Sequence, residues 1–130
     1  MSFQRGGFMF KSIHTLAIYV SDMERAKRFY TEILGFDVRA DLCPTLCFLI
    51  SKSGNINIYL EAGHKPNPVD MDDTHLSFFL ETEKSAKETF DALKAAGVEI
   101  LNDAPEEVGD GVFAFQFLDP DGNILEATGH

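Results

Sequence analysis

Two histidines and two glutamates recur at matching places in the two halves of this 130-residue chain. His14 and His75 each have a threonine beside them, and Glu61 and Glu126 each stand between a leucine and an alanine. The glutamate follows the histidine by 47 residues in the first half and by 51 in the second. Imidazole and carboxylate together suit zinc, nickel, cobalt, manganese or iron. The repeat therefore predicts one divalent metal site held by His14, Glu61, His75 and Glu126.

Strand parity favours a polar cavity beside these candidates. In the predicted strand Ile56–Glu61, the side chains of Asn57, Tyr59 and Glu61 share one face, and the intervening apolar residues share the other. The faces opposite His75 and Glu126 are likewise apolar. Asn57 and Tyr59 are therefore candidate cavity residues. Arg39 is a further one, either as an anion clamp or as a plain surface charge.

The elements that carry these residues form the same series, βαβββ, in each half. The expected strands are Ile13–Val20, Phe36–Arg39, Thr45–Ser51, Ile56–Glu61, His75–Leu80, Val98–Leu101, Val112–Leu118 and Ile124–Thr128. Residues 102–111 read as a loop. The N-terminal module is expected over residues 1–62, with an irregular tail to about residue 10, and the C-terminal module over 74–130. The proline-containing segment 63–73 is the expected linker, and the fold class is α+β.

Each half has one amphipathic helix. The first is expected to begin at Ser21, where Ser21 and Glu24 form a capping box, and to bury Ala26, Phe29, Tyr30 and Ile33 on one stripe before it ends at Gly35. The second is expected over Glu83–Ala96, with a buried stripe of Ala86, Phe90 and Leu93 and with Gly97 at its end.

Composition limits the possible partners. The net charge of −10 disfavours nucleic acid and anionic membranes. Apolar residues make up 45% of the chain, enough for a core, and no apolar run reaches the roughly 20 residues of a transmembrane helix. The N-terminal ten residues do not read as a signal peptide. Cys43 and Cys47 are expected to be reduced packing residues, which fits the cytoplasm.

Several other features have ordinary structural interpretations. The Asp119–Asn123 segment is a turn by its chemistry, so its aspartates need no function. His64 and His130 are expected to be solvated. The alternating Phe113, Phe115 and Phe117 are expected to pack in the core.

Three motifs in order resemble the vicinal-oxygen-chelate superfamily, which includes glyoxalases, bleomycin resistance proteins and extradiol dioxygenases. The opening motif is Ile13-His14-Thr15-Leu16 with Asp22, Phe29-Tyr30 and Leu34-Gly35-Phe36; the middle one is Thr74-His75-Leu76-Ser77-Phe78; and the closing one is Asp119-Pro120-Asp121-Gly122-Asn123-Ile124-Leu125-Glu126. The resemblance covers nearly the whole chain after about Phe10. It implies a curved, incomplete β-barrel with its helices outside and a metal on the concave side.

By position, the resemblance implies that His14, His75 and Glu126 are metal ligands. The fourth ligand is Glu61 according to the internal repeat, or Tyr59 according to a gapless fit to the family pattern. We favour Glu61 because its motif is duplicated. The implied reaction is of the lyase or isomerase type on a small α-oxo or vicinal-oxygen substrate. In that reaction the metal acts as a Lewis acid, and Glu126 or Glu61 transfers the proton.

Other family activities remain open. Lactoylglutathione lyases carry an arginine four residues after the first histidine, where this chain has Ile18, so glutathione use is in doubt. A ferrous dioxygenase using His14, His75 and Glu126 is one alternative. A metal-free antibiotic-binding protein is another, and the 12 phenylalanines suit it. A homodimer is expected, since an incomplete barrel leaves strand edges to cover.

Overall fold

The computed structural model describes residues 9–66 and 79–130. Its elements follow the expected order, βαβββ twice, with a π-helical turn continuing the first helix. They are β1 (Leu16–Tyr19), α1 (Met23–Arg28), η2 (Phe29–Ile33), β2 (Asp37–Cys43), β3 (Leu46–Ile50), β4 (Asn57–Glu61), β5 (Phe79–Glu81), α2 (Ala86–Ala95), β6 (Glu106–Gly109), β7 (Val112–Leu118) and β8 (Ile124–Gly129).

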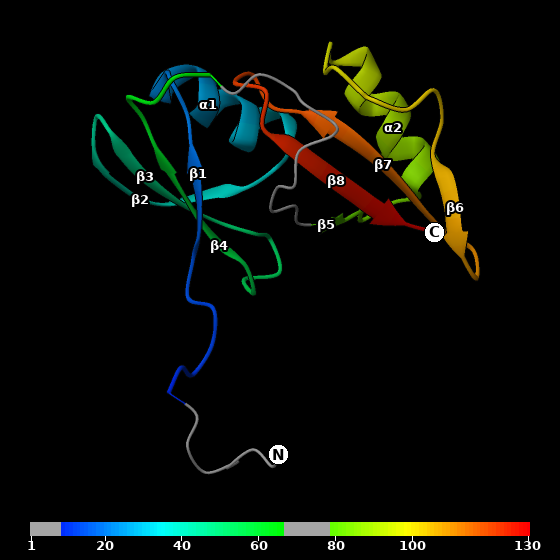
Figure 1. Cartoon of the computed structure of the whole chain (residues 1–130), viewed down its shortest axis with the longest axis horizontal. Helices are drawn as coiled ribbons and strands as arrows, with labels where there is room; N and C mark the ends of the chain where they lie inside the picture. The colour runs from blue at the N-terminus through cyan, green and yellow to red at the C-terminus, as the bar shows by residue number, and fades with distance from the viewer. Residues whose placement is uncertain (1–8, 67–78) are drawn as a thin grey trace, which may run out of the picture.

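The strands form two four-stranded sheets, ordered β1-β4-β3-β2 and β5-β8-β7-β6. In each sheet one outer strand pairs in parallel with the last strand of its half, β1 with β4 and β5 with β8, and the remaining pairs are antiparallel. Figure 1 shows each sheet with its own helix, α1 over the first and α2 over the second. The α+β class and the two βαβββ modules are confirmed, and the sheets stay open rather than closing into a barrel.

One apolar cluster joins both halves. From the first sheet it takes Leu49, Ile58 and Leu60, each fully buried, and from the second it takes Phe115 and Phe117. The expected core position of Phe115 and Phe117 is confirmed, while Phe113 is only half-buried. Burying this much apolar surface is the main term that stabilises the fold.

The first helix begins one residue later than expected. Its N-terminal cap is Asp22, whose carboxylate accepts the Arg25 backbone amide at 3.0 Å, so the Ser21–Glu24 capping box is wrong. The Ser21 hydroxyl instead accepts a hydrogen bond from the Arg25 guanidinium at 2.8 Å. Asp and Ser are nearly equal as caps, and the fold uses the Ser21 backbone amide elsewhere.

The buried stripe of this helix also differs at its end. Ala26, Phe29 and Tyr30 are buried as expected, but Ile33 is 39% exposed. A π-turn closes there, and the Leu34 amide donates to the Phe29 carbonyl five residues back. The wider turn inserts one residue into the helical register, so Leu34 packs against the core in place of Ile33.

In the second half, the helix and the last two strands form where they were predicted. The segment between the helix and those strands differs from the prediction. Ala86, Phe90 and Leu93 are buried as expected, although α2 begins later than predicted, with Ser85 as its cap. Residues 98–101 form only an isolated bridge from Ile100 to β7, not a strand.

The predicted loop 102–111 contains the edge strand β6, and that prediction was wrong. All of β6 is exposed, and Val108 is its one apolar side chain, so no period-two apolar pattern marks it. Residues 67–78 lie outside the described residues, and they include most of the expected linker and most of the expected strand His75–Leu80.

Within the described ranges, no helix is long and apolar enough to cross a membrane.

Both cysteines are free thiols, as expected. Cys47 is fully buried in the core, but Cys43 is exposed near the end of β2, so its expected packing role is wrong.

Candidate functional site

The two faces of β4 differ as strand parity predicts. Ile58 and Leu60 are fully buried toward the core, whereas Asn57, Tyr59 and Glu61 are half-buried on the opposite face. We call this second face, with the neighbouring Tyr19 of β1 and Phe48 of β3, the open face. Strand pairing orders it, because Glu61 lies beside Tyr19, and Tyr59 lies beside Phe48.

Glu61 has a partner that the sequence did not reveal. Its Oε2 lies 2.7 Å from Nε2 of His64, and the Tyr19 ring packs edge-on against the His64 imidazole with 4.7 Å between centroids. The His64 amide donates to the Val20 carbonyl, which returns the chain over the end of β1. We expected His64 to be merely solvated; it is 42% exposed but forms part of this cluster.

Tyr59 and Phe48 form an aromatic floor in the middle of the open face. Their ring centroids are 5.4 Å apart at a tilt of 44°. Burial raises the pKa of the Tyr59 hydroxyl, and the neighbouring Tyr19 side chain raises it further, so the phenol stays protonated near neutral pH. Tyr59 therefore presents a hydroxyl group rather than a phenolate.

Arg39 reaches the other end of the open face. Its Nη1 donates to Oδ1 of Asn57 at 2.5 Å, and Nδ2 of Asn57 donates to the His14 carbonyl at 3.5 Å. Arg39 belongs to β2 and Asn57 to β4, so the guanidinium extends across the intervening strand. The Arg39 guanidinium therefore reaches this face, and its role as an anion clamp stays a prediction.

His14 lies near Asn57, at the opposite end of β4 from Glu61. The carbonyl of His14 accepts from Asn57, and Glu61 lies four residues further along the strand than Asn57, about 13 Å at 3.3 Å per residue. The His14 side chain is exposed and bonds the Thr15 hydroxyl. Two ligands of one zinc-like ion each lie about 2 Å from it. The described geometry does not bring His14 and Glu61 to one ion.

Glu126 occupies the corresponding face of the second sheet. It is half-buried on β8, paired with Phe79 of β5 on one side and Gln116 of β7 on the other, while Leu125 and Ala127 face the core. It already has an interaction partner. His75, its expected co-ligand, lies outside the described residues. Within residues 9–66 and 79–130, no three His, Cys, Asp or Glu side chains gather closely enough to hold a metal ion.

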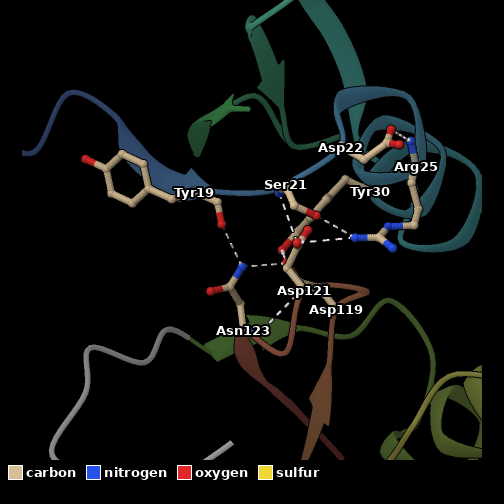
Figure 2. Close-up of polar contacts among 8 residues, drawn as sticks. All are labelled: Tyr19, Ser21, Asp22, Arg25, Tyr30, Asp119, Asp121 and Asn123. Carbon is tan, nitrogen blue, oxygen red and sulfur yellow. Dashed lines mark hydrogen bonds and ion pairs between the residues drawn. The ribbon is translucent and has the colours of Figure 1, made fainter. Parts of the chain in front are cut away.

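The Asp119–Asn123 turn is a buried polar hub, which the sequence interpretation missed. Figure 2 shows both carboxylates directed at the junction of β1 and α1. Asp119 is 4% exposed and accepts from the Tyr30 hydroxyl at 2.7 Å and from the Asn123 side chain at 2.8 Å. A buried tyrosine needs a hydrogen-bond partner, so Tyr30 on a buried stripe was the available signal.

Asp121 is the second carboxylate of this hub and is 2% exposed. Its Oδ1 accepts from the Ser21 amide at 2.9 Å and from the Arg25 guanidinium at 3.2 Å. Its Oδ2 is buried and has no hydrogen-bond partner. The hub holds the first module to the second, and it fixes Tyr19 as well, because Asn123 donates to the Tyr19 carbonyl at 3.1 Å. In Figure 2 the Tyr19 ring points away from the hub.

Comparison with known proteins gives relatives along nearly the whole chain. The chain is 35% identical over 119 residues to the uncharacterized protein YetH of Bacillus subtilis (strain 168), covering 90% of this chain and 97% of that protein. It is 30% identical over 125 residues to the glutathione transferase FosA of Serratia marcescens, covering 91% and 80%.

Solved structures agree with the fold. The antibiotic-binding protein TnmS3 of Streptomyces sp. CB03234 has a TM-score of 0.73 and 25% identity to this chain, covering 94% of this chain and 98% of TnmS3. The family model of the glyoxalase/bleomycin resistance protein/dioxygenase superfamily matches residues 12–127. The duplicated βαβββ modules, the shared core and this match agree, and the chain belongs to that superfamily.

Proposed function

We propose that this protein binds a small molecule on the open face of its first sheet. The observation that carries the proposal is the grouping of Tyr19, Phe48 and Tyr59 on one face, with polar side chains at both of its ends. Tyr19 is 46% exposed and Phe48 and Tyr59 are half-buried, so the rings offer area to a ligand.

Aromatic faces of this kind suit planar ligands. Stacked or edge-on ring pairs contribute about 0.5–1.5 kcal/mol each beyond burial, and tyrosine hydroxyl groups add directional hydrogen bonds. The similarity to an antibiotic-binding protein supports a binding role. Binding sites in general are mostly apolar with a few placed polar groups, which matches this composition.

The test is titration with two uncharged or weakly polar planar probes, 1-naphthol and naphthalene, followed by NMR. Phe48→Ala and Tyr59→Ala should each weaken binding by about threefold to tenfold, the loss of one ring pair. Phe10→Ala is the matched control, because Phe10 is 84% exposed in the segment before β1. Equal affinity in all three variants, or shifts confined to other residues, would contradict the proposal.

A second candidate is a metal-dependent enzyme of the lyase or isomerase type. It is favoured by the half-buried Glu126 on the second sheet and by the 30% identity to a glutathione transferase. The full set His14, Glu61, His75 and Glu126 does not fit the described geometry, because His14 and Glu61 lie at opposite ends of β4. We therefore centre this candidate on His75 and Glu126, and a ferrous dioxygenase would need His14 beside them.

Metal content tests this candidate. Protein purified without chelator would be analysed for nickel, cobalt, zinc, manganese and iron, then reconstituted with each ion. A stoichiometric metal that His75→Ala and Glu126→Gln both remove, and that His130→Ala retains, would support it. Retention in the first two variants, or no uptake of any ion, would reject it in favour of the binding role.

We also propose a homodimer in the cytoplasm. Phe79 is 64% exposed on the outer strand β5, and Val108 on the outer strand β6 is 65% exposed. Outer strands carrying exposed apolar side chains are natural pairing surfaces. Light scattering after size exclusion should give twice the mass of one chain. Phe79→Glu should lower the measured mass to that of a single chain.

A further inference from the structure

We propose that the open face is polarised along β4 and that its ligand is an elongated aromatic acid. The anionic group would lie at the Arg39–Asn57 end and a hydroxyl group at the Glu61–His64 end. This inference rests on the proposed binding function and adds the class and direction of the ligand.

The Arg39 end is built to accept an anion. The Arg39 guanidinium is held over the sheet by one bond to Asn57, and a guanidinium carries five N–H donors in a planar fork. The donors not used by Asn57 can receive a carboxylate in a bidentate pair. Asn57 is itself fixed by its bond to the His14 carbonyl, so the guanidinium has a defined position.

The Glu61–His64 end of the open face offers hydrogen-bond acceptors beside the aromatic ring of Tyr19. Glu61 uses Oε2 on His64, and a carboxylate has two oxygens that can each accept more than one bond. The Tyr19 ring packs edge-on against the His64 imidazole. A hydroxyl donor is therefore favoured at this end, whereas a second anion there would face the Glu61 carboxylate.

The spacing between the ends sets the ligand length. Asn57 and Glu61 lie about 13 Å apart along β4, and the Phe48–Tyr59 floor lies between them. One aromatic ring with a short conjugated arm to its acid group spans most of that distance. The net charge of −10 repels anions at long range, so selection for the acid must come from direct contact with Arg39.

Three probes separate the two ends: 4-hydroxycinnamate, its methyl ester, which lacks the charge, and cinnamate, which lacks the hydroxyl. Isothermal titration of the full chain should show 4-hydroxycinnamate binding at least about tenfold more tightly than either analogue, as expected for one charge-assisted hydrogen bond. Arg39→Gln should abolish the preference for acid over ester and keep the preference for hydroxyl. Glu61→Met should do the reverse.

Arg28→Gln is the matched control for Arg39→Gln, because both arginines are exposed and Arg28 lies on α1. Thermal melts check that each variant is folded, and His64→Phe is a second variant at the Glu61 end. If Arg39→Gln weakens all three probes equally, the polarised arrangement is wrong. If naphthol binds while none of the three cinnamates does, the polarity is wrong and the binding function stands. If neither class binds, both proposals fail.

Discussion

The Tyr30 hydroxyl donates to the Asp119 carboxylate at 2.7 Å, and this bond joins residues 89 positions apart. Tyr30 is fully buried and Asp119 is 4% exposed, so the bond forms inside the protein and links the first helix to the turn between β7 and β8. Together with the Asp121 contacts, it ties the two modules together beside the apolar core.

Tyr30→Phe should destabilise the protein by about 1–3 kcal/mol at neutral pH, because Asp119 loses a donor while remaining buried. The change is measured by urea unfolding, with Tyr19→Phe as the control at an exposed tyrosine.

The stability of the wild type and that of Tyr30→Phe should also depend differently on pH. Burial first, and then the Asp119 charge, hold the pKa of Tyr30 well above its usual range. A raised pKa in the folded state gives stability that is complete below the unfolded value, near 10, and is lost as pH rises through the folded value. The wild-type advantage over Tyr30→Phe should therefore shrink above about pH 10. A constant difference through pH 11 would contradict this assignment.

Asp121 should matter more than its ion-pair partner Arg25. Asp121→Ala removes the acceptor of the half-buried Ser21 amide and should cost about 2 kcal/mol. The Arg25 side chain is 44% exposed, so Arg25→Met should cost less than about 1 kcal/mol. Urea unfolding of both variants gives the order, and a larger loss for Arg25→Met would mean that the ion pair outweighs the amide bond.

The π-turn predicts which of two neighbouring residues is in the core. Ile33→Ser should change stability by less than about 0.5 kcal/mol, and Leu34→Ser should cost roughly 1–2 kcal/mol, because only Leu34 packs against the cluster. Thermal unfolding of the pair distinguishes them. The reverse order is the result expected of an uninterrupted α-helix.

The two thiols should react at very different rates. The hydrogen bond with Thr45 lowers the pKa of exposed Cys43, and burial raises the pKa of Cys47. Since the thiolate is the nucleophile, a maleimide at neutral pH should modify Cys43 quickly and leave Cys47 unmodified until the protein unfolds. Intact mass spectrometry follows the adducts. Thr45→Val should slow the first reaction, and rapid double labelling of the native protein would contradict the burial of Cys47.

The local periodicity of apolar residues predicted several elements of the fold and the faces that they bury. Alternation along Ile56–Glu61 predicted which side chains of β4 face the core, and the bounds of β7 followed from its apolar pattern. The spacing of Ala86, Phe90 and Leu93 predicted the buried side of α2. Such patterns are readable because period two and period 3.6 are properties of neighbouring residues. The exposed strand β6 has a single apolar residue, Val108, so its sequence contains no alternating pattern that distinguishes it from a loop.

The candidate site was less predictable for the same reason. The sequence by itself determined that Asn57, Tyr59 and Glu61 share a face, since parity is local. Only the tertiary structure decided that His64 folds back onto Glu61, that Arg39 reaches Asn57 across a strand, and that His14 lies at the far end of β4. It also decided that Asp119 and Asp121 are buried. Their partners come from the other module, and a turn-forming sequence is compatible with either solvent or a buried donor until the chain brings one to it.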